Sequence, residues 1–297
     1  MTTRQSASLA LQGEALAYRP DSSTHNRSRG SGIAGSGELR QQALAALALQ
    51  ESQEKCAAVW AMNASADVDA GCRLEPPSGL PGRPASPKLV APASVPRRAM
   101  STVEGRAALL HALAHIEFNA INLALDIMWR FPGMPEAFYL DWCKVASEEA
   151  THFDMLARRL QALGYAYGDF PAHDGLWEMA EKTQEDLLAR LALVPRTLEA
   201  RGLDASPPIR RRLAQAGDDE SAAILDVILR DEVGHVAIGN HWYKWLCNRD
   251  GNDPVAAYEA LAQRYQAPRL RGPFNLEARR AAGFDEAELE ALQRMAP

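Results

Sequence analysis

Two pairs of residues in this 297-residue sequence have the types and the spacing of a metal site. Glu149 stands three residues before His152, and Glu232 stands three residues before His235. Residues three apart on a helix lie on one face, so the carboxylate and the imidazole of each pair can bind one ion from the same side. Each pair also interrupts a stripe of apolar residues at helical spacing, where a lone buried charge is costly. The pairs therefore predict a cation in the protein core.

Two more glutamates align with these pairs if the chain folds into helical hairpins. Glu117 is 32 residues before Glu149, and Glu199 is 33 residues before Glu232. A turn midway between the two members, near residue 133 or residue 217, brings each glutamate level with its pair. Glu185 is the alternative to Glu199, because it lies 14 residues earlier and within about 40° on the same helical face.

The repeated pattern Glu…Glu-x-x-His supplies four carboxylates and two imidazoles, the ligand set of dinuclear carboxylate sites in helical bundles. The four negative charges balance two divalent cations, which makes their burial tolerable. Oxygen and imidazole ligands without a thiolate favour iron, with manganese as the alternative, over structural zinc. The predicted ligands of two iron ions are Glu117, Glu149, His152, Glu199, Glu232 and His235.

A further acid directly precedes the glutamate of each pair, Glu148 in the first and Asp231 in the second. An acid at this place can hydrogen-bond a ligand imidazole on the neighbouring helix and orient it. We assign this role to Asp231, acting on His152. Glu148 is nearly as compatible with a solvated surface position, and no role is assigned to it.

Four long helices are needed to position these side chains. Helical periodicity predicts them over residues 102–130, 136–163, 174–202 and 219–247, joined by short connections. A short helical piece over 209–216 is expected to follow a break at Pro207-Pro208. Strand-like alternation is absent from the sequence. The pattern predicts an all-α protein built on an antiparallel four-helix bundle.

Changes in composition divide the chain into four parts. Residues 1–36 are rich in Ser, Gly, Thr and Arg, and we expect them to be disordered. Residues 37–100 hold an N-terminal helix, over about 38–62, and a Pro/Gly-rich strap. Residues 101–248 form the bundle. Residues 249–297 form a wrapping C-terminal tail with a final short helix over about 285–295.

The overall charge and the cysteines exclude several classes of protein. A net charge of −6 argues against a basic nucleic-acid binder or a membrane-surface protein. No run of 18 apolar residues lacks a charge, so no membrane span is predicted. The first thirty residues lack the apolar core of a secretory signal. The four cysteines lie far apart without a C-x-x-C motif, which predicts reduced thiols in a cytoplasm.

Several longer strings in the sequence resemble those of a known family. HALAHIE, EEATHF, YGDFPAHDGLW, LVPRTLEARGLD and DEVGHVAIGNHWY look like domain-of-unknown-function family 455, a ferritin-like family of bacterial proteins, over about Arg97 to Gly283. The resemblance implies a ferritin-like four-helix bundle and supports the ligand residues, but it brings no settled activity. The string Glu199-Ala200-Arg201 is more distantly similar to the third-helix ligand motif of tRNA-modifying di-iron hydroxylases.

The favoured interpretation is an O₂-dependent oxidoreductase of the hydroxylase type, acting on a small molecule or another unidentified substrate and needing an electron donor. A tRNA substrate is left open, although the acidic charge disfavours nucleic acid. Two alternatives remain: a protein that oxidises or handles iron without an organic substrate, and a metal-free helical interaction module in which the Glu/His pairs are structural.

Overall fold

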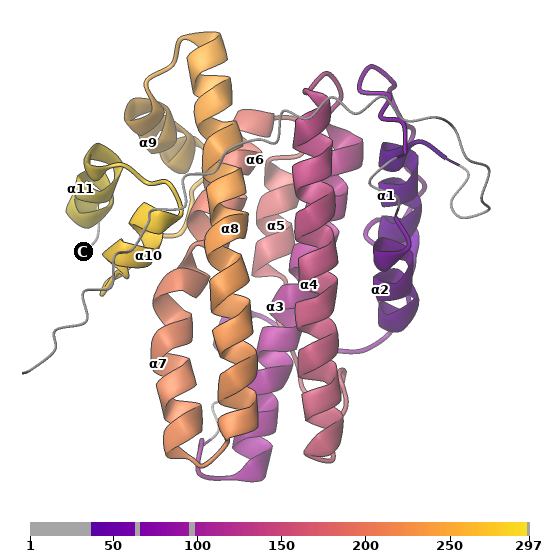
Figure 1. The fold of residues 1–297 in the computed structure, drawn as a ribbon, viewed down its shortest axis with the longest axis vertical. Helices are drawn as coiled ribbons and strands as arrows, with labels where there is room; N and C mark the ends of the chain where they lie inside the picture. Colours follow the sequence, from indigo (N-terminus) through magenta and orange to yellow (C-terminus); the bar gives the residue numbers. More distant parts are fainter. Residues whose placement is uncertain (1–36, 63–65, 95–98, 296–297) are drawn as a thin grey trace, which may run out of the picture.

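The computed structural model of this chain describes residues 37–62, 66–94 and 99–295. These parts form an all-helical fold, whose three longest helices run side by side along its long axis (Figure 1). Within the described ranges there is no strand, and one isolated bridge joins Leu89 to Ala172. The all-helical prediction is confirmed, whereas the predicted disorder of residues 1–36 lies outside the described residues.

The helical elements follow one another along the chain, with longer connections after α2, α4 and α9. In order they are α1 (Leu39–Ala48), α2 (Ser52–Trp60), the 3₁₀ turn η1 (Pro92–Ser94), α3 (Val103–Arg130), α4 (Glu136–Ala162), α5 (Gly175–Lys182), α6 (Leu187–Leu193), the π-helix η2 (Val194–Glu199), α7 (Arg201–Gln215), α8 (Asp219–Asp250), α9 (Pro254–Arg264), α10 (Leu276–Ala281) and α11 (Glu286–Met295).

The three long helices α3, α4 and α8 begin and end close to the residues that the sequence predicts. The Thr102 hydroxyl accepts the backbone N–H of Gly105, 3.0 Å away, and so caps the start of α3. Asp218 caps α8 in the same way. Gly164, at φ +85°, follows the end of α4. Helix α8 runs three residues further than predicted, as far as the left-handed Gly251.

Helix α3 is the most apolar of the long helices. Among the described helices it is the one long and apolar enough to cross a membrane. In the structure, 72% of its most apolar 18-residue window is buried against other elements. The sequence analysis predicted no membrane span here because it required 18 apolar residues without a charge, and Glu117 and Asp126 interrupt the apolar run. Burial of this extent is typical of the core helix of a bundle.

The third position of the bundle is not one helix, so the expected helix over 174–202 is wrong. It consists of α5, α6, η2 and α7 in succession. Pro195 has no N–H to continue the α-helical pattern. The chain instead forms a π-helix, in which an N–H binds the carbonyl five residues earlier rather than four. The Ala200 N–H accordingly donates to the Pro195 carbonyl at 3.0 Å. Gly239 of α8 packs against this turn, where a side chain would collide with Pro195.

The expected break at Pro207-Pro208 is also wrong, because α7 continues through both prolines. A proline inside a helix leaves the carbonyl four residues earlier without its donor. The freed Leu203 carbonyl accepts the side-chain amide of Asn275 at 3.2 Å, and the Asn275 backbone N–H donates to Asp204 at 2.8 Å. Asn275 therefore replaces one of the hydrogen bonds that the prolines remove, the one to the Leu203 carbonyl, while its backbone N–H binds the side chain of Asp204.

The N-terminal part packs on the opposite side of the bundle, against α3 and α4 (Figure 1). The predicted single helix over 38–62 is divided into α1 and α2. Arg40 of α1 is fully buried and donates to the carbonyls of Met128 and Trp129 in the last turn of α3. It also donates to the carbonyls of Asp69 and Cys72, both at 2.7 Å. One guanidinium thus joins the strap to the end of α3.

The contact between α8 and η2 can be tested by adding one methyl group. In Gly239→Ala the new Cβ would lie 2.6 Å from Cβ of Pro195, and we expect unfolding to become easier by about 1–3 kcal/mol because of overpacking. The matched control is Gly234→Ala on the same helix, where the new atom meets nothing within 4 Å. The control should be neutral or more stable by up to about 1 kcal/mol. Urea unfolding compares the two, and equal effects would contradict the close contact.

Candidate metal centre

Three helices bring five of the predicted ligands together at half the height of the bundle. Glu117 comes from α3, Glu149 and His152 from α4, and Glu232 and His235 from α8. All five side chains are buried. They form two groups, Glu117 with Glu149 and His152, and Glu149 with Glu232 and His235. Within each group, one potential ligand atom from every residue lies within 4.8 Å of the others, a spacing that could hold a metal ion.

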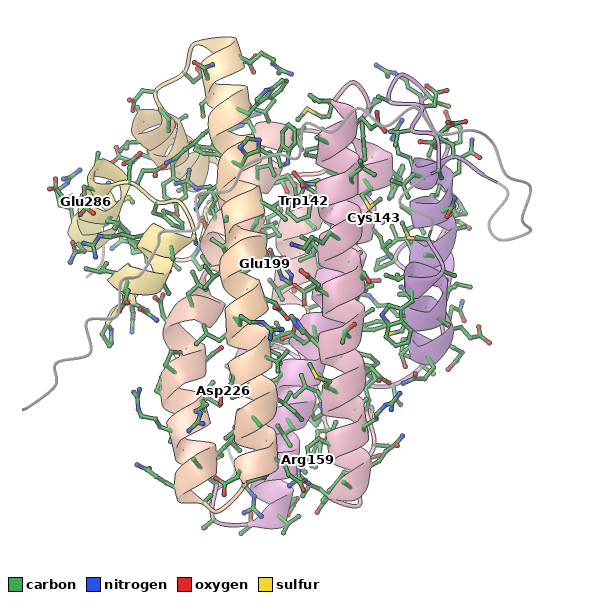
Figure 2. All side chains as sticks on the ribbon, in the orientation of Figure 1. Trp142, Cys143, Arg159, Glu199, Asp226 and Glu286 are labelled. Atoms are coloured by element: carbon green, nitrogen blue, oxygen red, sulfur yellow. The ribbon has the colours of Figure 1, made fainter. Side chains whose placement is uncertain are left out.

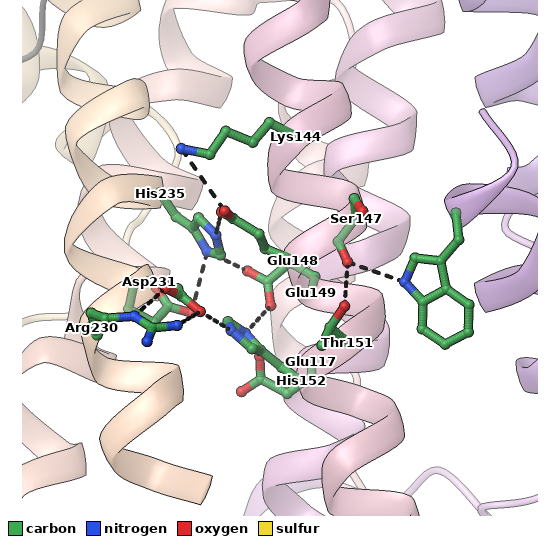
Figure 3. Close-up of polar contacts among 12 residues, drawn as sticks. Glu117, Lys144, Ser147, Glu148, Glu149, Thr151, His152, Arg230, Asp231 and His235 are labelled. Carbon is green, nitrogen blue, oxygen red and sulfur yellow. Dashed lines mark hydrogen bonds and ion pairs between the residues drawn. The ribbon is translucent and has the colours of Figure 1, made fainter. Parts of the chain in front are cut away.

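Glu149 belongs to both groups, and each of its oxygens faces a different imidazole (Figure 3). Its Oε2 lies 3.3 Å from Nδ1 of His152. Its Oε1 lies 2.9 Å from Nδ1 of His235. The centroids of the two imidazole rings are 5.7 Å apart. This is the arrangement in which one carboxylate can serve two adjacent cation sites.

The outer nitrogen of each imidazole contacts an acid on the opposite helix (Figure 3). Nε2 of His152 lies 3.1 Å from Asp231 on α8, and Nε2 of His235 lies 2.8 Å from Glu148 on α4. An Nε2–H donated to a carboxylate leaves the lone pair on Nδ1, which faces the centre. Both imidazoles therefore offer the same atom to the two groups.

The contact expected for Asp231 is present, whereas the treatment of Glu148 as a surface acid with no role needs correction. Glu148 is half-buried, and it is the acid that holds His235. The signal was in the sequence: an acid directly before Glu-x-x-His occurs in both halves, as Glu148 and as Asp231. It was missed because a single acid on a helix surface is usually solvated, and only the packing of α4 on α8 distinguishes the two cases.

Burial and mutual repulsion set the protonation of this cluster. The buried position of Glu117 and the negative charge of Glu149 raise the pKa of Glu117 well above its usual value. Burial and Glu149 act on Glu232 in the same direction and raise its pKa. Burial disfavours the charged imidazole of His152, but contacts with Glu117 and Glu149 outweigh this effect and raise its pKa to about 11. Without a cation, protons supply the positive charge that these carboxylates need.

Three buried polar atoms of the cluster have no hydrogen-bond partner among the described residues. They are Oε2 of Glu117, Oε2 of Glu232 and Nδ1 of His235. Nδ1 of His235 is close to Glu149, but the direction of approach is not that of a hydrogen bond. An unpaired buried polar atom costs about 1–3 kcal/mol. Cations bound by the two groups would give all three atoms a partner, so the donor set fits metal ions.

Glu199 lies near this cluster but outside both groups. It is the last residue of η2, at about half the height of the bundle (Figure 2), and it is partly exposed. Burial of its carboxyl group, with the charges of Glu232 and Glu149, raises its pKa well above the usual value. Glu185 is instead exposed and lines an open hollow with Arg249, beside the C-terminal end of α8. Of the two candidates, Glu199 is therefore the one near the cluster, and Glu185 is not.

An all-helical bundle with two buried Glu/His groups sharing one carboxylate is the class of protein that the fold and the cluster define. The chain belongs to the family described as "Protein of unknown function (DUF455)", whose model matches residues 42–290. The match begins before residue 97 and so includes most of α1 and α2. A Haemophilus influenzae protein described as "Uncharacterized protein" is 50% identical over 224 residues, which cover 73% of this chain and 78% of the relative. No solved structure gives a significant match.

The acids behind the imidazoles should control metal affinity. Glu148→Gln and Asp231→Asn each remove an ionised acceptor from a ligand histidine, and we expect metal binding about 10–100-fold weaker. Titration with Co²⁺ in competition with a chelating dye measures the change. The matched control is Asp226→Asn, five residues before Asp231 on α8, which removes only an exposed pair with Arg210. Wild-type affinity in both test variants would contradict the orienting role.

The stability of the metal-free protein should fall as the pH rises above neutrality. His152 has an ordinary pKa of 6.5 and a folded-state pKa of about 11. Its contribution is therefore complete below pH 6.5 and declines as the pH rises toward 11. The raised pKa of Glu117 gives the same sign. Urea unfolding in the presence of a chelator, from about pH 6.5 to about pH 9, measures this slope.

The same titration with saturating divalent metal should remove this decline. A metal ion competes with protons for carboxylates and imidazoles, so its affinity and the stability it adds increase with pH. Equal slopes with and without metal would show that the titrating groups do not bind the ion.

Proposed function

We propose that this protein binds two metal ions, most simply iron, and uses them in the O₂-dependent oxidation of an organic substrate. Glu149 carries the proposal, because one buried carboxylate faces an imidazole from each half of the bundle. The two ions would be held by Glu117, Glu149, His152, Glu199, Glu232 and His235, with Glu149 and Glu232 as the shared carboxylates and Glu117 and Glu199 each serving one ion.

The charge balance supports two divalent ions. Glu117, Glu149, Glu199 and Glu232 contribute four negative charges, which two divalent ions neutralise. Each imidazole is then neutral and binds through Nδ1, while its Nε2–H remains on the acid behind it. The absence of a thiolate from the cluster favours iron or manganese. Iron is the choice that adds redox chemistry, because two ferrous ions supply electrons for the reduction of oxygen.

The exposure of the side chains indicates the side from which a substrate would enter. The side chains of Glu149 and both histidines are 1% exposed, whereas that of Glu232 is 10% exposed and Glu199 is partly exposed. Access is proposed along η2 and α8. Here the protein would orient a small organic molecule and admit electrons from a separate donor.

The compartment is part of the same proposal. All four cysteines are free, and Cys56, Cys143 and Cys247 are buried. Burial raises the pKa of each of these three thiols, which disfavours the reactive thiolate. We place the protein in the cytoplasm, where such thiols remain reduced.

Metal content of the purified chain is the first test. Protein from iron-supplemented cells should contain about two iron ions per chain by elemental mass spectrometry, and the Glu149→Ala/Glu232→Ala variant should lose both because it lacks the bridging carboxylates. Glu199→Ala should weaken one site, whereas Glu185→Ala is the matched control and should retain both ions. Wild-type protein without metal, even after anaerobic loading with Fe²⁺, would overturn the proposal and leave a metal-free helical module.

Oxygen consumption then separates an oxidoreductase from an iron-handling protein. Ferrous protein prepared without oxygen should consume O₂ on mixing and retain its iron through repeated cycles with a chemical reductant. Release of ferric iron after each cycle would instead identify iron oxidation as the activity.

A further inference from the structure

A second site of unusual composition lies on the outer side of η2, away from the carboxylates. It is a hollow lined by Arg196 of η2, Arg279 of α10, and apolar residues of α9 and α11. The hollow spans about 360 Å³, including its open mouth. We call it the arginine pocket.

The two arginines of the arginine pocket are buried and only partly hydrogen-bonded. The side chain of Arg196 is 3% exposed and donates from Nη2 to Glu288 at 2.7 Å. Its Nε and Nη1 have no partner among the described residues. Arg279 is fully buried, and its Nε and Nη2 donate to the Asp204 carboxylate and the Ala200 carbonyl. Its Nη1 has no partner among the described residues.

The acids beside these arginines already accept several hydrogen bonds each. Oε2 of Glu288 already accepts from the Lys244 ammonium at 2.7 Å and from the Asp285 backbone N–H at 2.9 Å. Asp204 already accepts from Arg279 and from a backbone N–H. Three nitrogen atoms of the two guanidinium groups still have no acceptor within the part of the chain that the structure describes.

Aromatic rings stabilise the two guanidinium groups but provide no hydrogen-bond acceptor for the unpaired nitrogens. The guanidinium carbon of Arg196 lies 4.1 Å from the ring centroid of Tyr243 and 5.0 Å from that of Phe284. That of Arg279 lies 5.4 Å from the Phe284 centroid. Such stacking uses the flat faces of the guanidinium groups. The N–H groups point outward in the plane, so contact with the ring faces gives them no hydrogen-bond acceptor.

The number of unpaired donors argues for an anionic oxygen ligand. One water offers two lone pairs, fewer than the three unpaired nitrogens require. A carboxylate offers about four acceptor positions on two oxygens and forms charge-assisted bonds with guanidinium groups. Besides Glu288 and Tyr258, the remaining wall of the pocket is apolar and includes Leu270, Leu292 and Met295.

We propose that the arginine pocket binds a medium-chain carboxylic acid, with its carboxylate on Arg196 and Arg279 and its hydrocarbon tail along Leu270, Leu292 and Met295. The site is separate from the metal centre and does not depend on it. The two are nevertheless neighbours in the fold, since η2 carries Arg196 three residues before Glu199.

Calorimetric titration of the full, metal-free chain with octanoate tests the proposal. Octanoate should bind at least about tenfold more tightly than 1-octanol, which has the same tail and no charge, and octylamine should not bind. Inorganic phosphate tests the anion without a tail and should bind at least about tenfold more weakly than octanoate. Using metal-free protein keeps the outcome independent of the proposed oxidoreductase.

Variants at Met295 and Arg196 test whether octanoate binds in the arginine pocket. Met295 is 39% exposed at the pocket, so Met295→Glu should fold normally and weaken octanoate binding at least about tenfold by repulsion, whereas Met295→Gln should bind as wild type does. Arg196→Lys keeps the charge but loses the planar fork, and it should also weaken binding. A thermal melt of each variant establishes that it is folded.

Three results would overturn the proposal. Equal binding of octanoate and octanol would reduce the site to an apolar hollow. Binding of phosphate as tightly as octanoate would make it a general anion site. No binding of octanoate to folded wild-type protein would show that water alone accepts hydrogen bonds from the unpaired N–H groups of the two arginines.

Discussion

Burial of the Glu149 carboxylate is the constraint on which the rest of the bundle depends. A lone charge in a helical core is costly, and here both of its oxygens face an imidazole, one on its own helix and one on α8. Glu148 and Asp231 then hold the outer nitrogens across the same helix pair, in opposite directions. A sliding movement of α4 along α8 would break both contacts at once. The electrostatics of the core therefore determines the register of these two helices.

The segment α5–α6–η2–α7, which takes the third position of the bundle, places Glu199 beside this core at the cost of regular α-helical hydrogen bonds. Pro195 interrupts the α-helical pattern, and the resulting π-turn ends at Glu199. Such turns occur mainly at functional sites, because they re-aim one side chain within a helix. The π-turn is tolerated because Gly239 leaves room for it. The prolines further along, in α7, are tolerated because the Asn275 side chain donates a hydrogen bond to the Leu203 carbonyl. Segments distant in sequence thus stabilise the part of the helix that is least regular.

The candidate site could be predicted in large part, because its information is local. Glu-x-x-His is a spacing on one helix, and the hairpin distances from Glu117 and Glu199 need only a turn at the midpoint. The role of Glu148 could not be read in the same way. A carboxylate at a helix surface has the same local pattern whether it faces water or a histidine on another helix. Burial against α8 makes that choice.

The sequence by itself determined the helical class, the long helices α3, α4 and α8, and the two repeated Glu/His motifs, since each rests on periodicity within one segment. Only the tertiary structure decided the course of the chain over 174–215. Proline normally ends a helix because a carbonyl loses its donor. In this protein the side chain of Asn275, 68 residues after Pro207, supplies a donor to the carbonyl of Leu203. A hydrogen bond between residues so far apart leaves no local pattern, and it exists only once the C-terminal part has packed against α7.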